Sequence, residues 1–147
     1  MYIMPGYSMM AATATTFMLS IIFLILSKQS KKQYMRFWGI SWLVYSAMFL
    51  LDFCHLNWNF IYLGYVMLRQ MLALLGAYAF LLGTHHFFQT KYPASLGFAA
   101  ILSIISMSFY PAFNMVYTLM VIPNIIFSSG LLIYAGCMFI AISWTQK

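Results

Sequence analysis

An apolar run of membrane length occupies residues 68–88, LRQMLALLGAYAFLLGTHHFF, with Arg69 near one end and His85 and His86 near the other. The hydrocarbon core of a bilayer is about 30 Å thick, so a helix needs about 20 mainly apolar residues to cross it. This run meets that length. We expect the other segments of the chain to pack around it.

Charged residues are too few for a water-soluble fold. The chain of 147 residues is 65% hydrophobic and 5% charged, whereas an average soluble domain has roughly 25% charged residues. A soluble fold could not cover that much apolar surface. At about 17–25 residues per span, the chain has room for about four to six crossings. The sequence therefore predicts one integral membrane domain, residues 1–147, with no soluble catalytic domain.

Five apolar segments predict an all-α fold, a polytopic transmembrane helix bundle of about five spans. The expected spans cover residues 9–26, 37–53, 60–88, 94–109 and 112–144.

The third span is longer than a bilayer requires. Its roughly 29 residues would measure about 43 Å at 1.5 Å per residue, so we expect it to tilt, to kink at Gly76 or Gly83, or to project beyond the membrane. Small residues four apart, Ala79 with Gly83 and Ala73 with Ala77, allow another helix to approach closely. These pairs predict a closely packed, central helix.

The last apolar segment, residues 112–144, is too long for one untilted crossing and too short for two. Pro123 and Gly130 mark its most deformable part, because proline breaks the helical hydrogen-bond ladder. We expect a hinge there, in either one kinked span or a broken helix.

Basic residues set the expected orientation. Four of them, Lys28, Lys31, Lys32 and Arg36, share one short polar loop, which the positive-inside rule places in the cytoplasm. With five spans, the N-terminus then lies outside and the C-terminus inside, and Lys91 and Lys147 also fall inside. The formal net charge of +6 does not indicate nucleic-acid binding, since no basic face continues elsewhere.

Arg69 predicts a polar site near the outer leaflet. A guanidinium within a membrane helix is costly, about 2.5 kcal/mol or more at mid-bilayer, unless it reaches the interface or pairs. If the chain turns back near residue 57, an extended Arg69 reaches Asp52, the only acidic residue of the chain. We expect an ion pair between them with His55 nearby. The pair would either only fix two neighbouring helices or form an outward-facing pocket for an anionic or carbonyl-bearing ligand.

No cofactor or metal is predicted. His85 and His86 are adjacent on a helix and point about 100° apart, so both cannot easily serve one metal, and His55 lies toward the opposite leaflet. They are weak candidates for a metal or haem site. One carboxylate cannot make an acid–base pair, and the sequence has no CxxC, no HExxH and no phosphate-binding glycine loop. The sequence therefore predicts a protein that is not an enzyme.

Two stretches carry a resemblance to a known class of protein. Residues 31–53, KKQYMRFWGISWLVYSAMFLLDF, and residues 68–88 resemble the multi-span N-terminal membrane sensor modules of bacterial diguanylate cyclases and histidine kinases. In those modules a Trp-containing helix follows a basic loop, and the next helix is an apolar run that bears glycine and ends in aromatic residues. Such modules often have six to eight spans and precede an output domain, and this chain departs from both features.

The function expected from these features is that of a non-enzymatic sensor or input module, with Arg69, Asp52 and His55 as an outward-facing site that signals to a cytoplasmic partner. One alternative is a subunit of a small-molecule transporter or channel, and another is a haem- or pigment-binding subunit. The expected partners are the lipid bilayer, a cytoplasmic signalling protein, and other copies of the chain or a larger membrane complex. The resemblance implies the bacterial cytoplasmic membrane.

Overall fold

The computed structural model describes residues 4–58, 62–91, 95, 97–98 and 117–145. Within these residues the fold is all-α, as predicted, with no strand. Four helices make it up: α1 (Met4–Ser30), α2 (Gln33–Trp58), α3 (Tyr62–Phe88) and α6 (Tyr117–Thr145).

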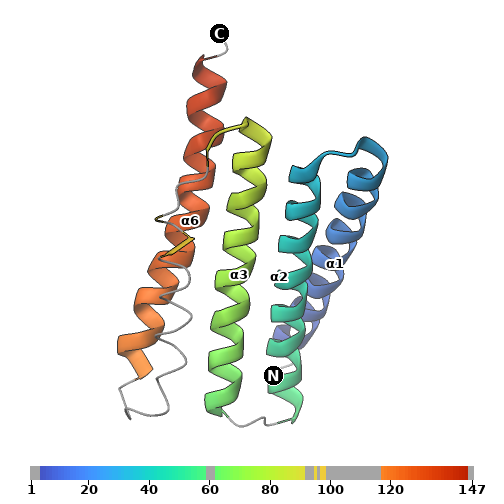
Figure 1. Cartoon of the computed structure of the whole chain (residues 1–147). Helices are drawn as coiled ribbons and strands as arrows, with labels where there is room; N and C mark the ends of the chain where they lie inside the picture. The colour runs from blue at the N-terminus through green and yellow to red at the C-terminus, as the bar shows by residue number, and fades with distance from the viewer. Residues whose placement is uncertain (1–3, 59–61, 92–94, 96, 99–116, 146–147) are drawn as a thin grey trace.

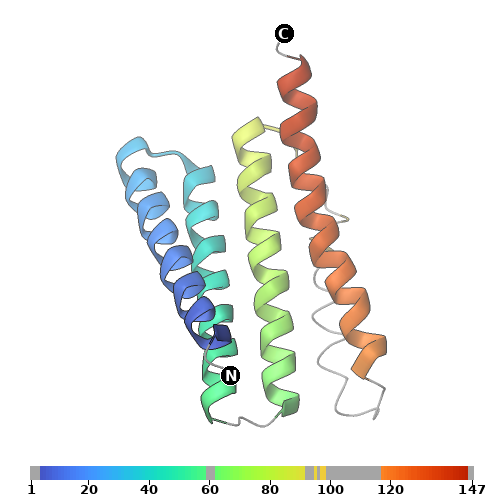
Figure 2. The ribbon, with the colours of Figure 1, turned by 180° about the vertical axis from the view of Figure 1, so that it is seen from behind.

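The helices stand side by side, with α2 and α3 between α1 and α6 (Figures 1 and 2). Helix α2 packs between α1 and α3, and α6 packs on the opposite side of α3. The contact between α3 and α6 buries a small apolar cluster, and its members are Leu74, Ala77, Leu81, Leu131 and Ala135. Among the described helices, α3 is thus one of two inner helices, and α2 is the other.

Three of the described helices are long and apolar enough to cross a membrane. The candidate spans are Gly6–Ser30, Gln33–His55 and Gly64–Phe88, and α6 contains a shorter apolar stretch, Ile125–Ala141. The expected fourth span, 94–109, lies outside the described residues except for Ser95, Gly97 and Phe98, which are helical. The count of five spans stays a prediction.

The basic loop expected at residues 28–36 is shorter than the sequence suggests. Only Lys31 and Lys32 lie outside helices, because α1 continues through Ser30 and α2 begins at Gln33. Lys, Gln and Arg are good helix formers, so both helices extend beyond their apolar runs. Lys31 has a φ of 55°, the left-handed conformation that commonly ends a helix. Gln89 ends α3 in the same way, with a φ of 54°.

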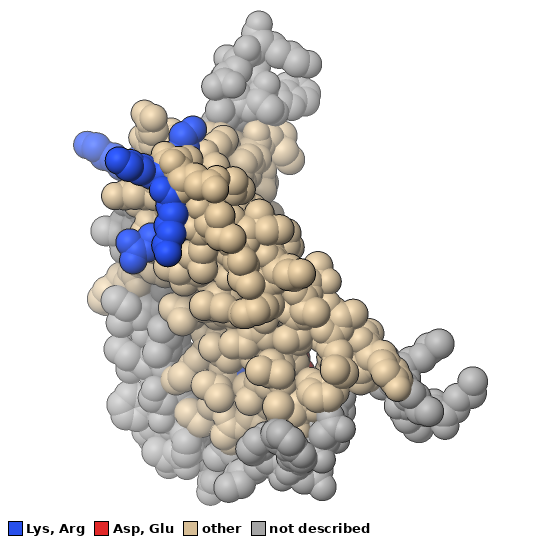
Figure 3. Space-filling view, turned by 90° about the vertical axis from the view of Figure 1, so that its right-hand side faces the viewer, with Lys and Arg blue, Asp and Glu red and all other residues tan. Residues whose placement is uncertain are grey.

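Basic side chains gather at the end of the bundle that contains the α1–α2 turn (Figure 3). The antiparallel order brings this turn beside the end of α3. All of these side chains are exposed to solvent: Lys28, Lys31, Lys32, Arg36 and Lys91. We name this end of the molecule the basic end.

Glycines of α3 allow close approach to α2 rather than interrupting the helix. Helix α3 is helical throughout Gly76 and Gly83, the two expected kink positions. A Cβ at Gly76 would lie 3.1 Å from the ring of Tyr45, and a Cβ at Gly83 would lie 2.7 Å from Nε1 of Trp38. The hydroxyl of Ser41 donates a 2.8 Å hydrogen bond to the carbonyl of Gly76. The two glycines therefore let the rings of Tyr45 and Trp38 in α2 lie directly against the backbone of α3.

An aromatic cluster surrounds Trp38 near the basic end. The ring centroid of Trp38 lies 5.2 Å from that of Tyr34 and 5.6 Å from that of Phe87. All four described helices contribute rings to this cluster: Phe23, Tyr34, Trp38, Phe80, Phe87 and Phe139. Trp38 thus fills the space that Gly83 leaves open.

We predict that Gly83→Ala destabilises the bundle by about 1–3 kcal/mol, the usual cost of overpacking a closely packed interior. The added methyl would meet the indole of Trp38 and the backbone carbonyl of Tyr34. Thermal unfolding of the purified protein in detergent would measure this loss. Gly136→Ala is the matched control, because no atom lies within 4 Å of a Cβ there. Equal effects of the two substitutions would contradict a close contact at Gly83.

Candidate functional site

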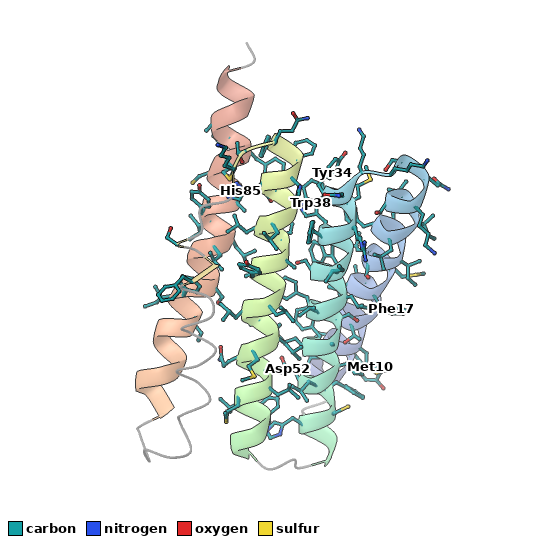
Figure 4. All side chains as sticks on the ribbon, viewed as in Figure 1. Met10, Phe17, Tyr34, Trp38, Asp52 and His85 are labelled. Carbon is teal, nitrogen blue, oxygen red and sulfur yellow. The ribbon has the colours of Figure 1, made fainter. Side chains whose placement is uncertain are left out.

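Asp52 of α2 and Arg69 of α3 form the ion pair that the sequence predicts. The Nε atom of Arg69 donates to both carboxylate oxygens of Asp52, at 2.9 Å to Oδ1 and 3.2 Å to Oδ2. Asp52 is buried, with 6% of its surface exposed. It lies between α2 and α3, away from the end that bears Tyr34, Trp38 and His85 (Figure 4). The buried carboxylate is therefore neutralised across the seam between these two helices.

Arg69 contacts Asp52 with only part of its guanidinium group. Both hydrogen bonds come from Nε, and among the described residues the two terminal amino groups donate to no acceptor. The Arg69 side chain is 36% exposed, whereas Asp52 is closed off. An arginine fork can bind a carboxylate or phosphate with two parallel hydrogen bonds. The unused edge of Arg69 is thus the part of the site able to hold a ligand.

Tyr65 completes the shell around the carboxylate, and the sequence reasoning missed it. Its hydroxyl donates a 2.7 Å hydrogen bond to Oδ1 of Asp52. Residues four apart on a helix share a face, so the spacing from Tyr65 to Arg69 was the available signal.

His55 joins this group through Tyr65 rather than through Asp52. The two rings stack with centroids 3.8 Å apart and planes 7° from parallel. The structure therefore brings together the three predicted site residues, Arg69, Asp52 and His55, and adds Tyr65. Their role in binding a ligand stays a prediction.

The two histidines at the other end of α3 face different helices. His85 is buried, its Nδ1 lies 2.7 Å from the hydroxyl oxygen of Thr90, and its ring lies 6.0 Å from that of Tyr134 in α6. His86 is exposed and stacks on Phe37 of α2 at 5.1 Å. Within the described parts of the chain, no three His, Cys, Asp or Glu residues gather as a metal site would require.

The expected hinge residues lie inside one helix. Helix α6 is helical from Tyr117 to Thr145 and so contains both Pro123 and Gly130. Among the described residues, no atom lies within 4 Å of a Cβ at Gly130, so none of the other described helices packs directly against the backbone there. The structure favours one helix over a broken one, and motion at Pro123 or Gly130 stays a prediction.

Comparison of the chain with protein-family models, curated proteins and solved structures gives no match. The resemblance to bacterial sensor modules therefore stays a prediction.

The two partners of the ion pair differ in exposure, which predicts unequal effects of their removal. In Arg69→Gln, the closed-off carboxylate of Asp52 keeps only the Tyr65 hydroxyl, and we expect a loss of about 3 kcal/mol, as for a broken buried pair. In Asp52→Asn, the half-exposed Arg69 can extend toward the interface, and we expect a loss of about 1.5 kcal/mol.

Unfolding of both variants in one detergent gives the comparison, and the double variant gives the coupling. Residues in direct contact are not additive, so the double variant should lose less stability than the sum of the single losses. A larger loss for Asp52→Asn than for Arg69→Gln would contradict this account.

Proposed function

We propose that the protein is a non-enzymatic membrane sensor or input module, with the Asp52–Arg69 group as its outward-facing ligand site. The observation that carries this proposal is that the two members of the ion pair differ in exposure and in how many of their polar atoms are hydrogen-bonded. Asp52 is buried and bonded by Arg69 and Tyr65, whereas Arg69 is 36% exposed and donates from Nε alone. A pair that served only to join two helices would have no need of this open edge.

The charge distribution supports an outward-facing site. The basic end carries five exposed basic side chains, and the positive-inside rule favours the cytoplasm for such an end. The Asp52–Arg69 group lies toward the opposite end of α2 and α3 (Figure 4). In this orientation the N-terminus is outside, the C-terminus is inside, and the ligand approaches from outside.

The N–H groups of Arg69 that do not donate to Asp52 determine which class of ligand can bind. The free edge of a guanidinium offers N–H groups and a positive charge, which match a carboxylate or phosphate. No second Lys or Arg belongs to this group of described residues, and Asp52 itself repels an anion. A small monovalent anion or a carbonyl group therefore fits this site better than a multivalent anion.

Transmission to the cytoplasmic end would run through α3. This helix carries Arg69 on its outer half and packs against α6 through Leu74, Ala77 and Leu81. A ligand that drew Arg69 away from Asp52 would loosen the contact of α3 with α2 and leave its contact with α6 in place. A signal requires that the ligand bind one of these two arrangements more tightly than the other.

The test uses acetate and inorganic phosphate as probes, added to the purified protein in detergent. We expect acetate to raise the thermal unfolding midpoint in a saturable way, because a ligand of the folded state stabilises it. Arg69→Lys should reduce that rise, since lysine keeps the charge that pairs with Asp52 but lacks the fork.

Lys91→Gln is the control, because it removes a basic side chain at the opposite end and should leave the response to acetate unchanged. The proposal fails if neither probe gives a saturable change, or if Arg69→Lys responds as the unchanged protein does. Acetate uptake into proteoliposomes that depends on Arg69 would indicate the alternative, a transporter subunit.

A further inference from the structure

A second polar depression lies at the basic end, far from the Asp52–Arg69 group. It has a volume of about 310 Å³ and opens between the α1–α2 turn and the end of α3. Its walls are formed by Lys32, Gln33, Tyr34, His86, Phe87 and Gln89. We name it the headgroup pocket, and nothing in the proposed sensing function uses it.

The surroundings of the headgroup pocket are strongly basic and have no internal counter-charge. Five exposed basic side chains lie at the basic end, and one of them, Lys32, lines the pocket. The only acidic residue of the chain is Asp52, and its carboxylate already accepts hydrogen bonds from Arg69. No carboxylate side chain of this sequence is therefore left to pair with the basic end, which is suited to bind an anion from outside the chain.

The pocket wall combines polar donors with aromatic faces. The Lys32 ammonium lies 5.8 Å from the centroid of the Tyr34 ring, close enough for a cation–π contact. His86 is exposed and stacks against Phe37, and 40% of the surface of Phe87 is exposed. Lys32, Gln33 and Gln89 supply N–H donors, while Tyr34 and Phe87 supply apolar surface. This pairing suits a ligand whose charged group adjoins a hydrocarbon part.

We propose that the headgroup pocket binds the phosphate of an anionic phospholipid. The pocket lies at the ends of α2 and α3, two helices long and apolar enough to cross a bilayer, so it falls at the depth of lipid headgroups. Clusters of Lys and Arg beside a membrane helix attract anionic lipids. The exposed aromatic surface at the pocket favours a lipid over an acidic protein, because an acidic protein would bring charge without an acyl chain.

The test uses delipidated full-length protein in detergent, titrated with dioleoyl phosphatidylglycerol or with dioleoyl phosphatidylcholine. We expect the anionic lipid to raise the thermal unfolding midpoint in a saturable way and the zwitterionic lipid to have little effect. Lys32→Gln should raise the half-saturating concentration of the anionic lipid by about fivefold, because it removes the ammonium group that lines the pocket.

Lys28→Gln is the matched control, because Lys28 belongs to the basic end but does not line the pocket. We expect a clearly smaller change for it, because Lys28 has no direct contact with a phosphate in the pocket. Lys32→Arg keeps the positive charge, so it should retain the response to the anionic lipid. Two further titrations, with inorganic phosphate and with polyglutamate, separate a lipid from a free anion and from an acidic protein.

Three outcomes would overturn the proposal. Equal stabilisation by the two lipids would remove the role of charge, and equal weakening by Lys28→Gln and Lys32→Gln would replace the pocket with a diffuse charged surface. A saturable, Lys32-dependent response to phosphate or polyglutamate, with none to phosphatidylglycerol, would assign the pocket to another partner. All of these results are independent of Arg69, so they do not decide the sensing function.

Discussion

Burial of apolar surface gives little drive for helices to associate inside a bilayer, so α2 and α3 must be held together by close packing and by hydrogen bonds between them. Gly76 and Gly83 allow the close packing, because they let Tyr45 and Trp38 lie directly against the backbone of α3. Ser41 provides a hydrogen bond between the helices, from its hydroxyl to the carbonyl of Gly76. With the backbones this close, Arg69 reaches Asp52 across the same seam.

Two kinds of hydrogen bond satisfy hydroxyl side chains of the described helices. The exposed or half-exposed hydroxyls of Thr13 and Thr15 donate within α1 to the carbonyl four residues earlier, at 2.8 Å each. The buried hydroxyls of Ser41 and Ser46 donate across a helix interface instead, to the carbonyls of Gly76 and Thr13. Burial alone does not decide between the two, because the buried hydroxyls of Thr16 and Thr84 donate within their own helices, to the carbonyls of Ala12 and Phe80.

Sequence reasoning could predict the all-α class, the first three apolar helices and the Asp52–Arg69 pair, because a single acid and a single intramembrane arginine leave little choice of partner. It could not predict that α1 continues to Ser30. An apolar run indicates the part of a helix that would lie inside a bilayer, and it does not indicate where the helix ends. Nor could it decide whether Gly76 and Gly83 bend α3 or let α2 approach. That choice depends on which side chains lie opposite, and in the structure these are Tyr45 and Trp38.

The order of the paired charges along the chain has a consequence for biogenesis. Asp52 and Arg69 are 17 positions apart and lie on consecutive antiparallel helices joined by a short connection. Each charge alone would resist entry into the bilayer by about 2.5–3.5 kcal/mol on insertion scales. Together they can enter as a hairpin whose net intramembrane charge is zero. Residues 33–88 would then be inserted as one unit rather than helix by helix.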